Sequence, residues 1–170
     1  ILDRSVKRAI EKADGSRPVI AHSGVLPHPP QLDGTDTHVS FGWNHGDDRD
    51  LPGFARALPR LVRFVSGFGS QSVPDTAGFA HPDQWPTLDW EALAEHHGMA
   101  ATVFERRIPA VDHPSFRSWQ QATQEYQAEL LRHHVETLRR LKYRPTGGFA
   151  TVGFADSQPA ISARRSHNRC

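Results

Sequence analysis

The stretch 61–74, Leu-Val-Arg-Phe-Val-Ser-Gly-Phe-Gly-Ser-Gln-Ser-Val-Pro, most constrains the fold of this chain. Residues 61–65 form a short apolar run with β-branched and aromatic side chains, interrupted only by Arg63. The run stops abruptly, and Gly67 and Gly69 follow it. Such a run, ending in glycines, is typical of a buried parallel strand followed by a loop with unusual backbone angles. We therefore predict a strand over 61–65 and a loop from Ser66 onward.

Apolar runs, alternation and helical spacing predict the remaining elements. The other expected strands lie at 17–24, 37–43 and 148–156. The expected helices lie at 2–13, 51–58, 89–97 and 116–141. Residues 75–118 give mixed signals and are interpreted as an insertion. Short apolar strands that alternate with helices favour an α/β fold with a parallel sheet.

The amino-acid composition and net charge limit the kinds of partner and cofactor that we expect. The net charge of +1 over 170 residues gives no electrostatic reason to expect nucleic acid or an anionic membrane as a partner. The single cysteine, Cys170, is the last residue, so we expect no internal disulfide and no cysteine-based metal site. The eleven histidines show no metal-ligand spacing, and no metal or other cofactor is expected. We also expect no signal peptide and no membrane span, and the compartment stays open, with the cytoplasm favoured.

The motif Phe64-Val-Ser-x-Phe-Gly-x-Gln-x-x-Pro74 resembles the seventh barrel strand of family 2 glycoside hydrolases. That family contains the β-galactosidases, β-glucuronidases and β-mannosidases. Three more segments resemble its neighbouring strands in the correct order: strand five, strand six and strand eight match residues 16–20, 34–43 and 147–156, respectively. The resemblance implies α/β architecture as a partial (β/α)8 TIM barrel, roughly strands five to eight with their helices. Residues 1–160 would form this C-terminal barrel half, and 161–170 an atypical, disordered tail.

The resemblance implies a fragment of a retaining β-glycoside hydrolase of the β-mannoside or β-galactoside class. Such enzymes need two carboxyl groups about 5–5.5 Å apart. The family's nucleophilic glutamate aligns with Gly67, which has no side chain, and the acid/base glutamate would precede residue 1. The resemblance therefore implies that this chain alone is inactive, and whether it is an enzyme stays open. The alternative is a non-catalytic carbohydrate-binding or vestigial barrel fragment, and an unrelated α/β domain is a third reading.

Several residues near these motifs are candidates for binding a β-linked carbohydrate. Each also has a structural interpretation: Asp36 could cap a strand, and His38 and Trp43 could belong to the core. Trp85 is a candidate lid over the sugar, and Asp156 ends the last predicted strand, where barrel active-site residues lie. Gln71 is expected to hold the loop after the 61–65 strand. The implied partners are the sugar, the missing N-terminal barrel half and accessory domains.

Overall fold

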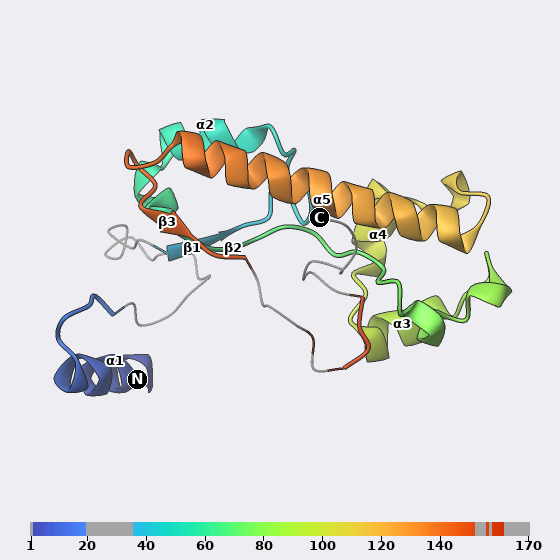
Figure 1. The fold of residues 1–170 in the computed structure, drawn as a ribbon, viewed down its shortest axis with the longest axis horizontal. Helices are drawn as coiled ribbons and strands as arrows, with labels where there is room; N and C mark the ends of the chain where they lie inside the picture. Colours follow the sequence, from blue (N-terminus) through green and yellow to red (C-terminus); the bar gives the residue numbers. More distant parts are fainter. Residues whose placement is uncertain (1, 20–35, 152–155, 157, 162–170) are drawn as a thin grey trace.

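The computed structural model describes residues 2–19, 36–151, 156 and 158–161. Its centre is a parallel sheet of three strands, β1 (Asp36–Val39), β2 (Phe64–Phe68) and β3 (Gly148–Phe149), which lie side by side in chain order (Figure 1). The prediction of an α/β fold with a parallel sheet is therefore confirmed. A closed barrel is not present in the described residues.

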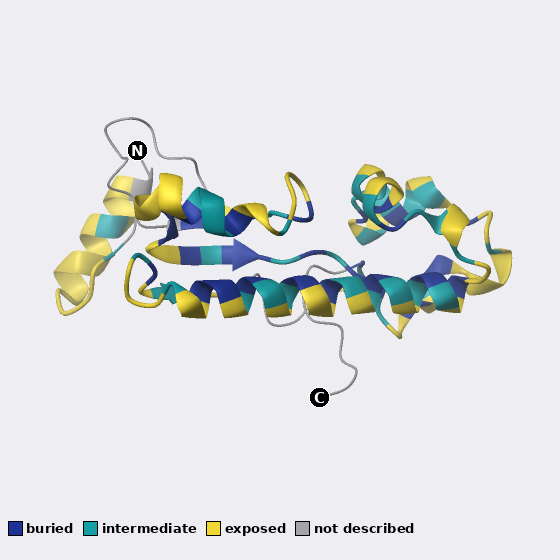
Figure 2. Ribbon diagram, turned by 90° about the horizontal axis from the view of Figure 1, so that it is seen from above, coloured by how far each residue is buried: buried dark blue, intermediate teal, exposed yellow. Residues whose placement is uncertain are grey.

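Two helices connect the three strands and lie on the same side of the sheet. Helix α2 (Asp50–Ala57) follows β1, and helix α5 (Phe116–Arg140) precedes β3. Seen from above, β2 runs between these two helices (Figure 2). The apolar core of this part joins strands and helices through Val39, Leu51, Ala55, Val62, Val65, Phe68 and Leu138. Consecutive parallel strands connected over one face are the arrangement expected of right-handed crossovers.

Strand β2 differs from its prediction in both position and shape. Leu61 and Val62 are buried, but they lie in a 3₁₀ turn (Pro59–Val62), so the prediction of a strand over 61–65 was wrong in its boundaries. A short apolar run does not distinguish a strand from another buried segment, which explains the error. Gly67 lies inside the strand, and the unusual backbone angle belongs to Gly69, with φ of 120°.

The other predicted strands are shorter than expected. Strand β1 ends at Val39, because the chain turns at Gly42, which has φ of 80°. Strand β3 covers only two residues of the 148–156 prediction, and 152–155 lie outside the described residues. Of the 17–24 prediction, residues 17–19 form no strand, and the remainder lies outside the described residues.

The predicted helices are all present. Besides α2 and α5, they are α1 (Leu2–Ala13) and α3 (Trp90–His97), whose N-cap Asp89 accepts a hydrogen bond from the amide of Ala92 at 2.9 Å. The expected apolar face of α1 is not covered by described residues, since Val6 and Ile10 are almost half exposed. None of the described helices is long and apolar enough to cross a membrane.

The predicted insertion contains more structure than its sequence indicated. Helix α4 (Ala101–Arg107) and three short 3₁₀ turns, Ala77–Ala80, Pro82–Gln84 and Ala110–Asp112, surround α3. Their core is aromatic and includes Trp43, Phe104, Phe116 and Trp119. Helix α5 therefore packs on this aromatic core near its beginning and on the sheet near its end (Figure 1).

Candidate functional site at the carboxyl ends of the strands

The first feature of the site is the pairing of two residues from neighbouring strands. His38 of β1 stands opposite Gly67 of β2, although 29 residues separate them in the sequence. His38 is exposed, and Gly67 is buried. Residues near the carboxyl ends of adjacent parallel strands border the crevice in which ligands of α/β proteins bind. This pairing brings two of the predicted site residues together.

A bulge in β2 sets this register. Thr37 pairs with Val65, but the next residue, His38, pairs with Gly67, so that Ser66 is the extra residue. Because of the bulge, Val65 and Phe68 both enter the core beneath the helices. Bulges are frequent beside active sites, where they change the direction of a side chain.

The loop after β1 is shaped by its own carboxylates. Asp50 accepts a hydrogen bond from the amide of Asp47 at 2.8 Å, and Asp47 accepts one from the amide of Arg49 at 3.1 Å. A side-chain hydrogen bond with Asp48, followed by the bond from the Arg49 amide, lowers the pKa of the exposed Asp47 carboxyl. These carboxylates therefore close the turn that leads into α2, and no group of three metal-ligating side chains occurs among the described residues.

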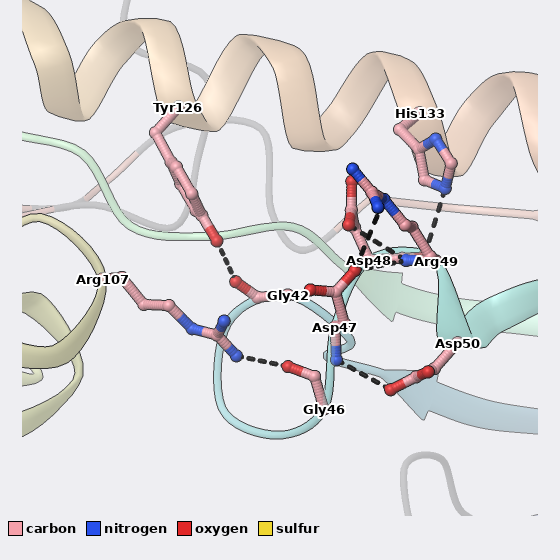
Figure 3. A network of polar contacts seen from close by, with 9 residues as sticks. All are labelled: Gly42, Gly46, Asp47, Asp48, Arg49, Asp50, Arg107, Tyr126 and His133. Atoms are coloured by element: carbon pink, nitrogen blue, oxygen red, sulfur yellow. Dashed lines mark hydrogen bonds and ion pairs between the residues drawn. The ribbon is translucent and has the colours of Figure 1, made fainter.

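Helix α4 fastens the same loop through its last two residues. The guanidinium of Arg106 donates to the carbonyls of Trp43, at 2.9 Å, and Asn44, at 3.2 Å. The guanidinium of Arg107 donates to the carbonyl of Gly46 (Figure 3). Main-chain carbonyls in a loop have few other partners, so these charge-assisted bonds fix its position.

Helix α5 fastens the loop from the other side. The Tyr126 hydroxyl donates to the carbonyl of Gly42, and the Nε2 atom of His133 lies 3.1 Å from the carbonyl of Asp48 (Figure 3). Burial is the largest cause that raises the pKa of Tyr126, which keeps its hydroxyl a donor. The loop after β1 is thus held by α4 and α5 together.

The segment after β2 is held by Gln71, as predicted. Its side-chain amide donates to the carbonyls of Gly98, at 2.6 Å, and Ile161, at 3.1 Å. Its side-chain oxygen accepts from the amide of Ala100 at 2.8 Å. One side chain therefore joins the end of β2 to the segment between α3 and α4 and to residue 161.

Two of the remaining candidate residues, Asp36 and Trp43, do not lie beside His38 and Gly67. Asp36 is the first residue of β1 and pairs with Phe64. Trp43 is only 4% exposed and packs edge-on against Phe104, with ring centroids 5.1 Å apart. Trp43 is therefore a core residue, which was one of its two interpretations from the sequence. Its indole has no open face on which a sugar could stack.

Trp85 lies away from the strand ends, in the aromatic core. Trp85 is half-buried in the aromatic core, 5.5 Å from Trp119 between ring centroids. Asp156 is exposed, and its chain neighbours lie outside the described residues. Within the described part of the chain, only residues of β1 and β2 form the candidate site.

A polar cleft of about 540 Å³ beside the loop was missed by sequence reasoning. It lies between the loop after β1, α4 and α5, and its ionic lining residues are Asp47, Asp48, Arg106, Arg107, Glu129, Arg132, His133 and Glu136. The signal was present in α5, where Tyr126, Glu129, His133 and Glu136 recur at three- and four-residue steps.

Comparison with known proteins finds no matching family model, no similar curated protein and no similar solved structure. The interpretation of the site therefore rests on the residues and on their geometry.

Proposed function

We propose that this chain is part of a retaining β-glycoside hydrolase of family 2, of the β-mannoside or β-galactoside class. In this proposal Gly67 occupies the position of the catalytic nucleophile, and His38 belongs to the sugar-binding side of the same crevice. The chain as it stands lacks the carboxylate and is catalytically inactive by itself.

The pairing of His38 with Gly67 is the observation that carries the proposal. The two residues belong to separate motifs that resemble strands six and seven of the family. Neighbouring barrel strands must pair in parallel, with their site residues at the same edge. That two separate motifs meet in this way supports the resemblance independently of their sequences.

The topology gives further support. The strands follow one another in the order β1-β2-β3, and the connecting helices lie on one side of the sheet (Figure 1). Consecutive units of a β/α barrel have this order and this one-sided cover. We infer that the three strands correspond to barrel strands six, seven and eight.

The chemistry of position 67 decides what the chain can do. A retaining glycosidase forms a covalent bond between a carboxylate oxygen and the anomeric carbon while the leaving oxygen is protonated by a second carboxyl group. Glycine offers no atom for this bond. A small anion that enters the space of the missing side chain could attack the anomeric carbon instead.

Gly67 itself favours a second candidate function, a non-catalytic carbohydrate-binding protein. A glycine at the nucleophile position preserves the crevice but removes the bond-forming group. In this case the β-linked sugar binds at the carboxyl ends of β1 and β2 and is released unchanged.

The test uses 2,4-dinitrophenyl β-mannoside and β-galactoside, whose leaving group needs no acid catalyst. Azide is added as an external nucleophile: it forms a C–N bond at the anomeric carbon as the bond to dinitrophenolate breaks. We expect dinitrophenolate release from the unaltered chain only with azide, and from Gly67→Glu without it. Gly67→Gln without azide and Ser66→Glu are the matched controls, and neither should release it.

Sugar titration followed by nuclear magnetic resonance separates the two functions. Binding of the β-mannoside without any azide-dependent release would favour the non-catalytic protein. Neither binding nor release, in a folded chain and in the chain joined to its preceding coding sequence, would contradict both. That preceding sequence should encode four more strand–helix units and an Asn-Glu pair after the fourth strand.

A further inference from the structure

A cavity of about 400 Å³ lies in the aromatic part of the molecule, away from the strand ends. Its lining comes from α3, α4, the segment after α4 and the beginning of α5. Trp119 and Phe104, both almost fully buried, belong to this lining, together with the half-buried Trp90. The volume falls within the range of small-molecule sites, about 300–1,000 Å³.

The polar atoms around the buried tryptophan are already satisfied. The indole Nε1 of Trp119 donates to the carbonyl of Ile108 at 2.9 Å, so the ring turns no unpaired donor toward the cavity. The ring planes of Trp90 and Trp119 are nearly perpendicular, at 86°, with centroids 5.5 Å apart. Trp119 is fully enclosed by its neighbours, so a flat ring in the cavity would meet the half-buried Trp90, in the offset-stacked or edge-to-face geometry that aromatic pairs favour.

One charged side chain, Glu105 of α4, lines the cavity. Glu105 is exposed and makes no hydrogen bond or ion pair within the described residues. A carboxylate beside indole rings attracts a cation and repels an anion, and an ammonium group also interacts favourably with the indole faces. The electrostatics therefore favour a positively charged ligand.

The surroundings fit a small molecule better than a second protein. Six large apolar side chains are notably exposed in the described chain, and of these only Val111 borders the cavity. Stable protein interfaces bury about 800 Å² on each partner. One exposed valine beside a confined hollow does not provide such a surface.

We propose that this cavity binds a small planar aromatic molecule, and that it prefers one carrying an ammonium group that pairs with Glu105. The proposal is independent of the glycosidase proposal, because the cavity shares no residue with β1 or β2.

Three naphthalene probes of the same size test the preference: naphthylmethylammonium, the neutral naphthylmethanol and naphthoate. Binding is measured by calorimetry and by the indole N–H signals of the four tryptophans. We expect the signals of Trp90 and Trp119 to shift most and that of Trp43 least. The cation should bind about three- to tenfold more tightly than the neutral probe, and the anion most weakly.

Two variants separate the contributions of charge and shape. Glu105→Gln should abolish the preference for the cation and leave the affinity for the neutral probe unchanged. Ala101→Phe places a ring at the lining of the cavity and should weaken all three probes at least about tenfold. Ala128→Phe, at an exposed position of α5 outside the cavity, is its matched control and should change nothing.

Three results would overturn the proposal. The first is equal affinity for the anion and the cation, and the second is an unchanged affinity in Ala101→Phe. The third is that no probe binds because a second copy of the chain covers the cavity. Sedimentation would then show a dimer, and Glu105→Gln would leave that dimer unchanged. If Ala101→Phe fails to fold, the loss of cation preference in Glu105→Gln still decides the question.

Discussion

The molecule contains two regions that share one helix and are built in different ways. The sheet region consists of β1, β2, β3, α2 and the end of α5, and a ladder of strand hydrogen bonds, interrupted by the bulge at Ser66, holds it together. The aromatic region consists of residues 71–115 and the beginning of α5, and it has no strand ladder among its described residues. Packed rings and side-chain hydrogen bonds take the place of the ladder.

The segment 70–75 shows how that replacement works. It lies extended along α5, and four side chains of the helix bond to it. Gln127 donates to the carbonyl of Ser70 at 2.7 Å, and Gln124 donates to that of Val73 at 2.9 Å. The Thr123 hydroxyl accepts from the Val73 amide, and Gln120 donates to the Pro74 carbonyl. The side chains of a helix can thus satisfy main-chain groups of an extended segment.

The largest expected effect tests whether the shared helix couples the two regions. Trp119→Ala removes the centre of the ring cluster and should lower the free energy of unfolding by about 3–5 kcal/mol. Leu138→Ala, in the sheet core, should lower it by about 2–5 kcal/mol. Because both residues lie on α5, the whole chain should unfold in one transition, and each variant should lower the midpoint of that transition. Denaturation followed by tryptophan fluorescence and by circular dichroism measures this. Transitions that separate between the two signals would show that the regions unfold independently.

The next effect is a pH dependence that belongs to the sheet region. His134 is fully buried against Phe68, and neither ring nitrogen makes a hydrogen bond of normal geometry with described residues. Burial, followed by the charge of His133, lowers the pKa of His134 to about 4, and the Phe41 main chain only partly opposes this.

The unfolded chain binds this proton at a higher pH, near 6.5, so stability is complete above that value and falls as the pH drops toward 4. The loss should reach about 3 kcal/mol. His134→Phe should remove this part of the slope, while His133→Gln should remove much less. Urea denaturation between pH 4 and 7.5 checks the prediction, and an unchanged slope in His134→Phe would contradict it.

A smaller effect is expected at the seam between the regions. Gln127 is buried and bonds both Ser70 and the Ser72 hydroxyl, which lies 3.0 Å away. Gln127→Ala removes the buried side chain to which both groups bond and should cost about 1–3 kcal/mol. Gln121→Ala, at an exposed position of the same helix, is the control. The rate of amide hydrogen exchange should rise first in residues 70–75. A rise confined to β1 would contradict the role of Gln127 in holding this segment.

The smallest effect compares two helix caps within the aromatic region. Asp89 caps α3, and Ser115 caps α5, with the Ser115 hydroxyl 3.2 Å from the amide of Ser118. Asp89→Ala and Ser115→Ala should each cost about 1 kcal/mol. Thermal denaturation measures both losses. A loss above about 3 kcal/mol in either variant would mean that the side chain does more than cap its helix.

The helices and the approximate positions of the strands could be predicted from the sequence, but the contacts between these elements could not. Helix α5 follows from apolar residues such as Leu130 and Leu138 at helical spacing, since local periodicity reports a buried face. The register of His38 with Gly67 depends on the bulge at Ser66, which leaves no periodic signal. The aromatic region joins rings far apart in the sequence, such as Trp43 and Phe104, and no local pattern reports such packing.

The register itself is the central claim, and cross-linking tests it most directly. Paired residues of neighbouring strands lie about 4.8 Å apart, within the reach of a disulfide, whose Cα atoms are usually 4.4–6.8 Å apart. In a Cys170→Ser background, His38→Cys with Gly67→Cys should form the bond under mild oxidation. His38→Cys with Phe64→Cys should not, because Phe64 pairs with Asp36. Equal or faster cross-linking of the second pair would contradict the register and the site built on it.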